Sequence, residues 1–331
     1  MNKLYIMQNI PSTGFTTMLP GWEIVFASED QMEQEAIVAE MQGCVAVVSV
    51  FGRKLTREMM VQVPSLRMVA NYGAGFDNID LAYCNDNKIL VTNSPAPVTE
   101  PTAELAMGLM VAVARQIVLK DRQLRQPGTL SWGVMNNLSH TLYGKTLGIV
   151  GMGKIGKAIA RRALAFGMKV IYHNRKPLPE SEALKYQATY HSFDSLLAVA
   201  DVVSLSTPLT DATRHLMDTR ALGLMKPTAI LVNTARGAVV DEKALIEALE
   251  KKIIAGAGLD VYEDEPNVSP ALLTMDQVVL MPHLGSGTIE AREEMSFVVA
   301  SNILSAFKGE LPENAVNTEM FEFFKQQIAD L

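Results

Sequence analysis

Three polar segments of this chain, residues 232–237, 260–266 and 281–286, each follow an apolar run typical of a buried strand. They carry an arginine, several carboxylates and a histidine, respectively. If the three strands belong to one parallel sheet, the segments lie at the same edge, because the carboxyl ends of parallel strands meet there. The sequence therefore predicts that these ionisable side chains come together.

These residue types suit the reduction of a 2-oxo acid beside a nicotinamide. Arg236 can bind the substrate carboxylate and polarise the keto oxygen, because its planar guanidinium stays charged and matches an anion. His283 can protonate that oxygen as a hydride arrives, while Glu265 can select the imidazole tautomer and stabilise the imidazolium. Singly, the segments have simpler interpretations: a capping arginine, a solvated acidic loop and a histidine after a proline turn. Glu263 is the next candidate for the carboxylate.

A glycine-rich turn is the candidate binding site for the nicotinamide cofactor. Residues 146–156 begin as an apolar run, break into glycines and resume at helical spacing. Gly151 suits the turn, Gly153 lets a pyrophosphate approach the backbone, and Gly156 lets the helix pack closely on its strand. The helix N-terminus offers unpaired N–H groups to that anion. A helical stripe and a second strand complete a βαβ unit: Ile155, Ile159 and Ala163, then residues 168–172. The alternative is a plain tight turn.

The residues at the end of the second strand indicate which dinucleotide is bound. In this fold an acidic residue there accepts hydrogen bonds from the ribose 2′-hydroxyl, whereas a nearby arginine favours a 2′-phosphate. Here Asn174 stands in the acidic position, and Arg175 and Lys176 follow it. A phosphate would find charge-assisted partners there, so the sequence predicts NADP as the preferred cofactor and NAD as the alternative. A solvated basic turn is the simpler interpretation.

Strands and helices alternate along the rest of the chain, which predicts two doubly wound α/β domains. In the first hundred residues we expect strands at 3–7, 45–51, 66–71 and 89–92, and helical segments at 30–41, 56–62 and 79–85. Further on we expect strands at 202–205, 230–232, 255–259 and 278–281. The later helices are expected at 194–200, at 241–251 with Asp241 as its cap, and at 289–307, an amphipathic helix followed by a mostly polar tail from Glu310.

The loop at residues 71–78 follows a predicted strand, where ligands of parallel sheets bind. From this loop alone we favour a structural interpretation, in which Gly73 and Gly75 adopt positive φ and Asn78 or Asp80 caps the next helix.

A long helix is predicted from Pro101, since proline suits a first turn. Residues 103–117 are apolar almost all round, which indicates burial on several sides, between domains or in a subunit interface. Trp132 follows in a polar stretch. It could anchor an interface, although a tryptophan that covers its own domain is the commoner case.

Composition excludes several classes of function. A chain of 331 residues exceeds what one core usually serves, so two domains are expected. The net charge of −7, without a basic block, argues against nucleic acid or an anionic membrane as partner. The apolar start, residues 1–7, is too short for a signal peptide, and no apolar run is long enough to span a bilayer, so we expect a cytoplasmic protein. Cys44 and Cys84 are expected to be buried thiols, and the histidine spacing predicts no metal site.

Several ordered motifs together resemble the D-isomer-specific 2-hydroxyacid dehydrogenases, and within them the glyoxylate/hydroxypyruvate reductase branch. The resemblance covers nearly the whole chain and rests on residues 73–77, 101–105, 151–156, 233–237, 258–266 and 282–286. It implies the catalytic set Arg236, Glu265 and His283, with Glu265 chosen among three acids by its place before Pro266. It also implies a departure, because Asn174 stands where NAD-using members carry an acid.

The resemblance further implies where ligands bind. The amides of Ala74 and Gly75 would bind the substrate carboxylate, together with Arg236 and His283. Asp260 would bind the nicotinamide carboxamide. The cofactor site would consist of Thr102, Gly151, Gly153, Lys154, Ile155, Gly156, Asn174, Arg175, Lys176, Ser206, Thr207, Pro208, Thr234, Ala235, Asp260, His283 and Gly285.

The resemblance also revises the domain organisation. It implies a Rossmann cofactor domain, residues 100–286, inserted into a discontinuous flavodoxin-like substrate domain formed by residues 1–99 and 287–331. It implies a homodimer through the long helix and the segment after it, which agrees with the apolar character of residues 103–117.

The expected activity is the NAD(P)H-dependent reduction of a small 2-oxo acid such as glyoxylate or hydroxypyruvate to the D-2-hydroxy acid. A formate- or phosphite-oxidising relative is the first alternative. The catalytic set argues against the formate enzymes, and Ala74, where phosphite enzymes place a lysine, argues against the phosphite enzymes. A dinucleotide-sensing corepressor on the same fold is the second alternative, and turnover with NADPH and glyoxylate would discriminate it.

Overall fold

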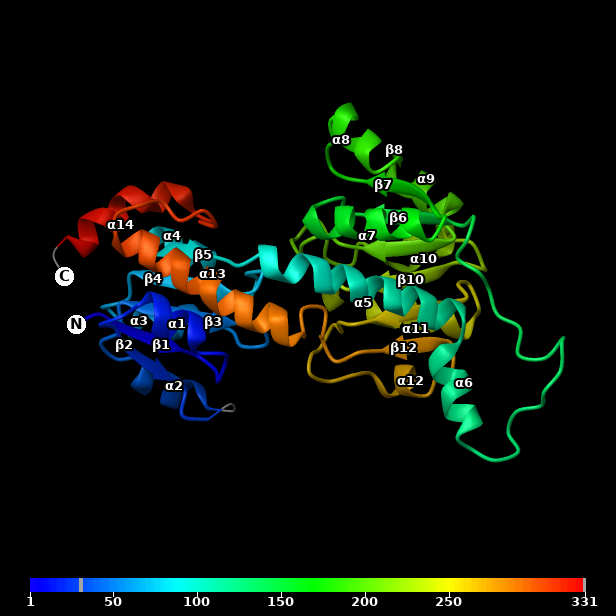
Figure 1. Ribbon diagram of the computed structural model, residues 1–331, viewed down its shortest axis with the longest axis horizontal. Coiled ribbons are helices and arrows are strands. Elements are labelled where there is room, and N and C mark those ends of the chain that lie inside the picture. The colour runs from blue at the N-terminus through cyan, green and yellow to red at the C-terminus, as the bar shows by residue number, and fades with distance from the viewer. Residues whose placement is uncertain (30–31, 330–331) are drawn as a thin grey trace. The chain divides into compact units, whose positions relative to one another are not determined.

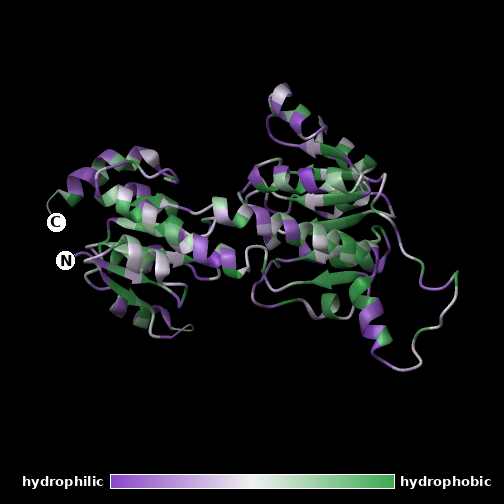
Figure 2. Ribbon diagram, viewed as in Figure 1, coloured by the Kyte–Doolittle hydropathy of each residue, from purple (hydrophilic) through white to green (hydrophobic). Residues whose placement is uncertain are grey.

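The computed structural model describes residues 1–29 and 32–329, which form two compact units. Unit 1 comprises Met1–Val98 and Ser286–Leu331, and unit 2 comprises Thr99–Gly285. Both units are built on parallel sheets whose strands are largely hydrophobic (Figures 1 and 2).

Unit 1 contains a five-stranded parallel sheet in the order β2-β1-β3-β4-β5, which is the flavodoxin-like order 2-1-3-4-5. Its central strand β3 is buried at every position, as its continuous apolar run predicts. The strands are β1 (Lys3–Ile6), β2 (Glu23–Phe26), β3 (Ala46–Val50), β4 (Met68–Tyr72) and β5 (Leu90–Thr92). The helices are α1 (Thr13–Met18), α2 (Gln34–Glu40), α3 (Arg57–Val61), α4 (Leu81–Asp86), α13 (Ile289–Phe307) and α14 (Phe321–Ile328), preceded by the 3₁₀ turn η2 (Thr318–Met320).

The C-terminal segment completes unit 1 because α13 packs directly on α1. A side chain at Gly14 would come within 2.3 Å of the Ser296 carbonyl carbon, and the Gly14 N–H donates to Ser296 Oγ at 3.1 Å. Only glycine permits this approach between the two helices. The two ends of the sequence therefore share one core.

Unit 2 contains a seven-stranded parallel sheet in the order β12-β11-β10-β9-β6-β7-β8. Counted from β6, this is the Rossmann order 3-2-1-4-5-6 with one further strand. The strands are β6 (Thr146–Val150), β7 (Lys169–His173), β8 (Ala188–Tyr190), β9 (Val202–Leu205), β10 (Ile230–Asn233), β11 (Gly256–Leu259) and β12 (Val278–Leu280). The helices are α6 (Ile117–Leu124), α7 (Lys154–Ala165), α8 (Glu180–Lys185), α9 (Phe193–Val199), α10 (Thr219–Leu224), α11 (Glu242–Glu250) and α12 (Pro270–Leu273), with the 3₁₀ turn η1 (Gly237–Val239).

The predicted fold class is confirmed, and most predicted elements occur within two residues of their expected bounds. Asp241 caps α11 through the Ala244 N–H, and Asp80 caps α4 through the Tyr83 N–H. Cys44 and Cys84 are free and buried, as expected. Helix α2 begins at Gln34, later than predicted, and Asp30 lies outside the described residues.

The predicted start of the long helix was wrong. Helix α5 (Ala96–Ala114) begins five residues before Pro101, which lies inside it. The proline removes one backbone donor, but Val98 and Thr102 on either side are buried, and that packing holds the turn in place.

Sequence reasoning missed two edge strands, β2 and β8. Each has one neighbouring strand and exposed positions, so the apolar signal is weak. It also missed α14 in the tail that was expected to be mostly polar, where Phe321 and Phe324 are buried.

Candidate active site

The glycine turn between β6 and α7 has the geometry of an anion-binding turn. Gly151 adopts φ +99°, a left-handed conformation that favours glycine, and its N–H donates to the His173 carbonyl. Space beside Gly153 is open to 4 Å, so a ligand can reach its backbone. No side chain in the described part of the chain caps the N-terminus of α7, and its first N–H groups therefore remain available to an anion.

Buried polar atoms in unit 2 also fit a dinucleotide. Ser206 Oγ and Thr234 Oγ1 are buried and have no hydrogen-bond partner among the described residues. Gly285 lies against Asp260 and Thr102, because a side chain built there would come within 3.1 to 3.3 Å of them. Polar groups that the chain leaves unsatisfied need an outside partner, and the hydroxyls and amide of a dinucleotide supply such partners.

Asn174 follows β7 and is oriented by the glycine turn. The Met152 N–H donates to Asn174 Oδ1 at 2.6 Å. Because an N–H needs an acceptor, this contact shows that the side-chain oxygen of Asn174 faces the turn. The Nδ2 group has no acceptor among the described residues. Arg175 and Lys176 are exposed, and no carboxylate in the described part of the chain pairs with them.

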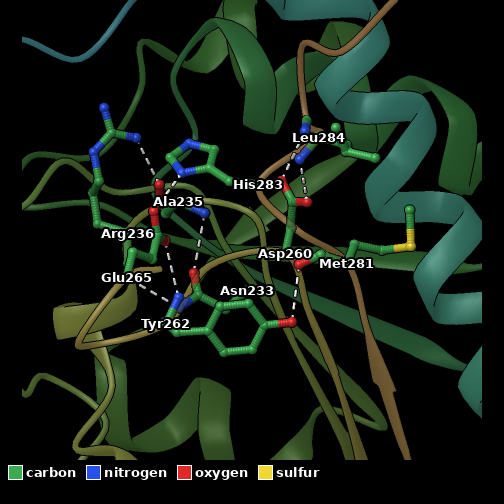
Figure 3. A network of polar contacts seen from close by, with 10 residues as sticks. Asn233, Ala235, Arg236, Asp260, Tyr262, Glu265, Met281, His283 and Leu284 are labelled. Carbon is green, nitrogen blue, oxygen red and sulfur yellow. Dashed lines mark hydrogen bonds and ion pairs between the residues drawn. The ribbon is translucent and has the colours of Figure 1, made fainter. Parts of the chain in front are cut away.

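His283 and Glu265 form a close pair in unit 2. His283 Nδ1 lies 2.7 Å from Glu265 Oε2, and the other oxygen of Glu265 accepts the Tyr262 N–H at 3.0 Å (Figure 3). Burial would raise the pKa of Glu265, but the hydrogen bond and charge of His283, the Tyr262 amide and Arg236 outweigh it and hold that pKa below its ordinary value. Glu265 is therefore ionised, and its carboxylate accepts the hydrogen bond from His283 Nδ1.

Arg236 follows β10 and its guanidinium lies beside this pair (Figure 3). Arg236 Nη1 donates to the Ala235 carbonyl at 2.8 Å. Asn233, buried at the end of β10, shapes the turn: its Nδ2 donates to the Arg236 carbonyl at 2.9 Å, and its Oδ1 accepts the Ala235 N–H at 3.0 Å. Sequence reasoning overlooked Asn233, although a polar residue that ends an apolar strand signals such a turn.

Asp260 organises the loop that carries His283. Its two carboxylate oxygens accept the N–H groups of Leu284 and Gly285 at 2.6 and 2.8 Å, and its carbonyl accepts the His283 N–H. Burial raises the pKa of Asp260, although the two amides oppose the shift. His283 itself has φ +55°, uncommon for a residue with a side chain, so the loop must hold it there. The sequence did not predict this structural role of Asp260.

Tyr262 joins the loop of Glu265 to the loop of His283. Its hydroxyl donates to the Met281 carbonyl at 2.9 Å, and burial raises its pKa to about 12. Two loops from neighbouring strands β11 and β12 are thus bonded to each other close to the histidine.

In unit 1, the loop after β4 holds the carbonyls of Ala74 and Gly75 and leaves their amides unpaired. Asn93 Nδ2 donates to the Ala74 carbonyl at 2.7 Å, and Asn71 Nδ2 donates to the Gly75 carbonyl at 2.6 Å. Neither N–H donates to another described residue. The prediction that Gly73 and Gly75 adopt positive φ was wrong, because the side-chain amides of Asn71 and Asn93 hold the turn instead.

The segment between α6 and β6 exposes large apolar side chains. Trp132 is 87% exposed and Val134 is 93% exposed, so of the two interpretations left open for the tryptophan, the commoner one, that it covers its own domain, does not hold. Other exposed apolar residues of this segment are Met135, Leu138 and Tyr143.

Among the residues that the structure describes, no group of three or more histidine, cysteine or acidic side chains could hold a metal ion. No single described helix is long and apolar enough to cross a membrane, and α5 with α6 reaches that length only as a pair bent by 60°.

A Rossmann sheet with a glycine turn, and with arginine, glutamate and histidine grouped after its strands, defines a dinucleotide-dependent oxidoreductase. The family model described as D-isomer specific 2-hydroxyacid dehydrogenase, NAD binding domain, matches residues 107–285. The chain belongs to this family. It is 42% identical over 323 residues to a glyoxylate reductase of Thermococcus litoralis, which covers 96% of this chain and 97% of the relative.

Solved structures show the same likeness. A glyoxylate reductase from Paecilomyes thermophila has a TM-score of 0.86 and 36% identity, covering 96% of this chain and 99% of the other. The NADPH-dependent glyoxylate/hydroxypyruvate reductase from Sinorhizobium meliloti, in complex with NADP and malonate, has a TM-score of 0.85 and 32% identity, covering 96% and 97%.

Proposed function

We propose that this protein reduces a small 2-oxo acid, such as glyoxylate or hydroxypyruvate, to the D-2-hydroxy acid with a nicotinamide dinucleotide. The observation that carries the proposal is the hydrogen-bonded His283–Glu265 pair beside Arg236, in the same unit as a glycine turn that leaves N–H groups free. The names of the relatives support this substrate class.

The geometry supports a division of roles among the three residues. Arg236 binds the substrate anion and polarises the keto oxygen with its fork of N–H donors. His283 donates the proton of Nε2 to that oxygen, because Nδ1 is already engaged by Glu265. Glu265 stabilises the protonated imidazole until the proton leaves. The bound cofactor supplies the hydride. The amides of Ala74 and Gly75 bind the substrate carboxylate.

NADPH is the proposed preferred cofactor, and the orientation of Asn174 supports it. Since Oδ1 accepts from the Met152 N–H, the group left for the ribose is the Nδ2 donor. A donor suits phosphate oxygens, and the exposed Arg175 and Lys176 add positive charge. A ribose hydroxyl of NAD would lack the carboxylate acceptor that usually receives it. Thr102, Thr207, Pro208 and Ala235 complete the proposed cofactor site, with Lys154 and Ile155 contributing amides.

The test is a panel of substrates assayed with NADPH and with NADH, comparing kcat/KM. We expect glyoxylate or hydroxypyruvate to give the highest values and the product to be the D isomer on chiral analysis. Phosphite and formate, included with the oxidised cofactors, should give no turnover. Cofactor binding without turnover of any 2-oxo acid would overturn the proposal and favour a dinucleotide sensor.

We also propose that the protein is a cytoplasmic homodimer joined through α5 and the segment that follows it. The exposed Trp132, Val134 and Met135 support this, because apolar groups so exposed mark interaction surfaces. Sedimentation should give a dimer for the wild type, and Trp132→Asp with Val134→Asp should shift it to monomer. Thr129→Asp, at an exposed polar position nearby, is the control and should remain dimeric. Cell fractionation tests the compartment.

A further inference from the structure

A second histidine–glutamate pair lies in unit 2, outside the set assigned to the reaction. His215 Nε2 lies 2.6 Å from Glu263 Oε1, and both side chains are partly exposed, at 40% and 32%. Glu263 is two residues from Glu265 in the same loop. The pair therefore attaches the loop of the proposed catalytic carboxylate to another part of the unit.

Glu263 also holds this loop against the N-terminus of α11. Glu263 Oε2 accepts the Glu242 N–H at 3.3 Å, and the Glu263 N–H donates to Glu242 Oε2 at 3.2 Å. The loop backbone packs on Gly237, where a side chain would come within 1.9 Å of the Tyr262 carbonyl group. Gly237 directly follows Arg236. The position of the loop is therefore coupled to the residue that would bind the substrate.

His215 comes from the segment that begins with the cofactor residues Ser206, Thr207 and Pro208. Thr213 closes this segment on itself, because its Oγ1 donates to the Pro208 carbonyl at 2.6 Å and accepts the Thr210 N–H at 2.8 Å. The His215 N–H donates to the Ala238 carbonyl at 2.8 Å, and His215 has φ +53°. A residue with a side chain held in that conformation indicates that the surrounding contacts fix it.

We propose that His215 and Glu263 are positioning residues that join the cofactor segment, residues 206–215, to the loop carrying Glu265. The contact sets the distance from Glu265 to His283. When the cofactor segment becomes ordered, the contact also orders the loop that carries Glu265, and with it the proton donor His283. Neither residue contacts the reacting atoms. This inference rests on the proposed function, because it assigns Glu265 to the reaction. The charged groups around Glu263 are His215 and Glu242, and those around Glu265 are His283, Arg236 and Asp260.

The first test compares His215→Leu, which removes the hydrogen bond, with His215→Gln, whose amide nitrogen can donate in place of Nε2. Both replacements bear the same backbone strain, so their difference isolates the contact. At saturating cofactor, we expect His215→Leu to lower kcat/KM for the 2-oxo acid by about tenfold or more, since small misplacements of catalytic groups are costly. The cofactor KM should rise, and the alkaline limb of the pH profile should move to lower pH. His215→Gln should largely restore the wild-type kcat/KM, the wild-type cofactor KM and the wild-type pH profile.

A matched control is His191→Leu, in which a partly exposed histidine is bonded through its side chain to Ser195 Oγ, at 3.1 Å. It should leave kinetics and pH profile unchanged. Both leucine variants should keep Tm within about 4 °C of the wild type, because exposed ion pairs contribute little stability. A His215→Leu variant with wild-type kcat/KM and pH profile would overturn the inference. So would a loss of activity that His215→Gln does not restore.

Hydrogen exchange tests the contact without turnover. In the free protein, His215→Leu should speed exchange of the amides in residues 261–265 relative to wild type and His191→Leu, and leave the strands of the sheet protected. Unchanged exchange there overturns the positioning role. If the wild-type protein reduces no 2-oxo acid, the proposed function fails, and this measurement still decides whether the pair orders the loop.

Discussion

His283 Nδ1 lies 2.7 Å from Glu265 Oε2, and the two residues stand 18 positions apart in the chain. Because an ionised carboxylate only accepts, Nδ1 carries a proton and donates it in a hydrogen bond to Glu265. Nε2 is the nitrogen that can donate to a substrate. Glu263, two residues earlier, faces a different histidine, His215. One loop thus holds two glutamates with two separate partners.

Glu265→Gln should shift the pH profile of reduction to lower pH. The neutral amide no longer stabilises protonated His283, so the proton donor is lost at a lower pH than in the wild type. The measurement is kcat/KM against pH with saturating cofactor. An unchanged profile would mean that another carboxylate serves His283, and Glu263→Gln would then be the next variant to profile.

Arg236→Lys should lose most activity although the charge is kept. An ammonium is a point charge and cannot hold a carboxylate and a keto oxygen as a planar fork does. Charge-assisted hydrogen bonds contribute roughly 1.5 to 3 kcal/mol each, so the loss of one should lower kcat/KM by about 10 to 100-fold. Arg220→Lys, at an exposed ion pair with Asp194, is the control. Near wild-type kcat/KM in Arg236→Lys would remove this residue from the substrate site.

Asn174→Asp should reverse the cofactor preference. A carboxylate repels the 2′-phosphate of NADPH and accepts from the ribose hydroxyl of NADH, so the ratio of the two kcat/KM values should change by about tenfold or more. Arg175→Ala should weaken NADPH and leave NADH nearly unchanged. Added salt should raise the KM for NADPH if Lys176 acts through screened charge. Equal weakening of both cofactors by Arg175→Ala, or a wild type that prefers NADH, would contradict the NADP assignment.

Asp201→Asn should remove part of the pH dependence of stability. Asp201 accepts the Thr146 N–H and Lys226 Nζ, each at 2.9 Å. Burial alone would raise its pKa, but these two partners outweigh burial and hold the pKa below the ordinary value. Because the folded pKa lies below the unfolded one, the carboxylate stabilises the fold above the unfolded pKa, about 3.9, and this contribution is lost as pH falls through the folded pKa.

The measurement is urea unfolding of both proteins from pH 7 into acid. The wild type should be the more stable at neutral pH, and the difference should shrink below about pH 4. Asp211→Asn, at an exposed position, is the control and should follow the wild type throughout. A constant difference between wild type and Asp201→Asn across this range would refute the assignment.

The amino-acid sequence determined the local structure and the kinds of chemistry available. Short runs that are largely apolar, such as Ala46–Val50 and Val202–Leu205, predict buried strands, and the glycines of residues 151–156 predict a dinucleotide-binding turn. Arginine, carboxylates and histidine after strands were readable as candidates, since parallel strands end at one edge. The predictions of the strands and of the glycine turn succeeded because they depend on neighbours within a few positions.

The tertiary structure decided how distant residues pair. The place before Pro266 singles out Glu265 only through the family resemblance. Packing of the loop on Gly237 and α11 directs Glu263 to His215 and Glu265 to His283. Packing also placed Pro101 inside α5, and hydrogen bonds to two distant amides gave Asp260 its role in the His283 loop. Contacts between residues tens of positions apart depend on the whole core, so a local pattern does not encode them.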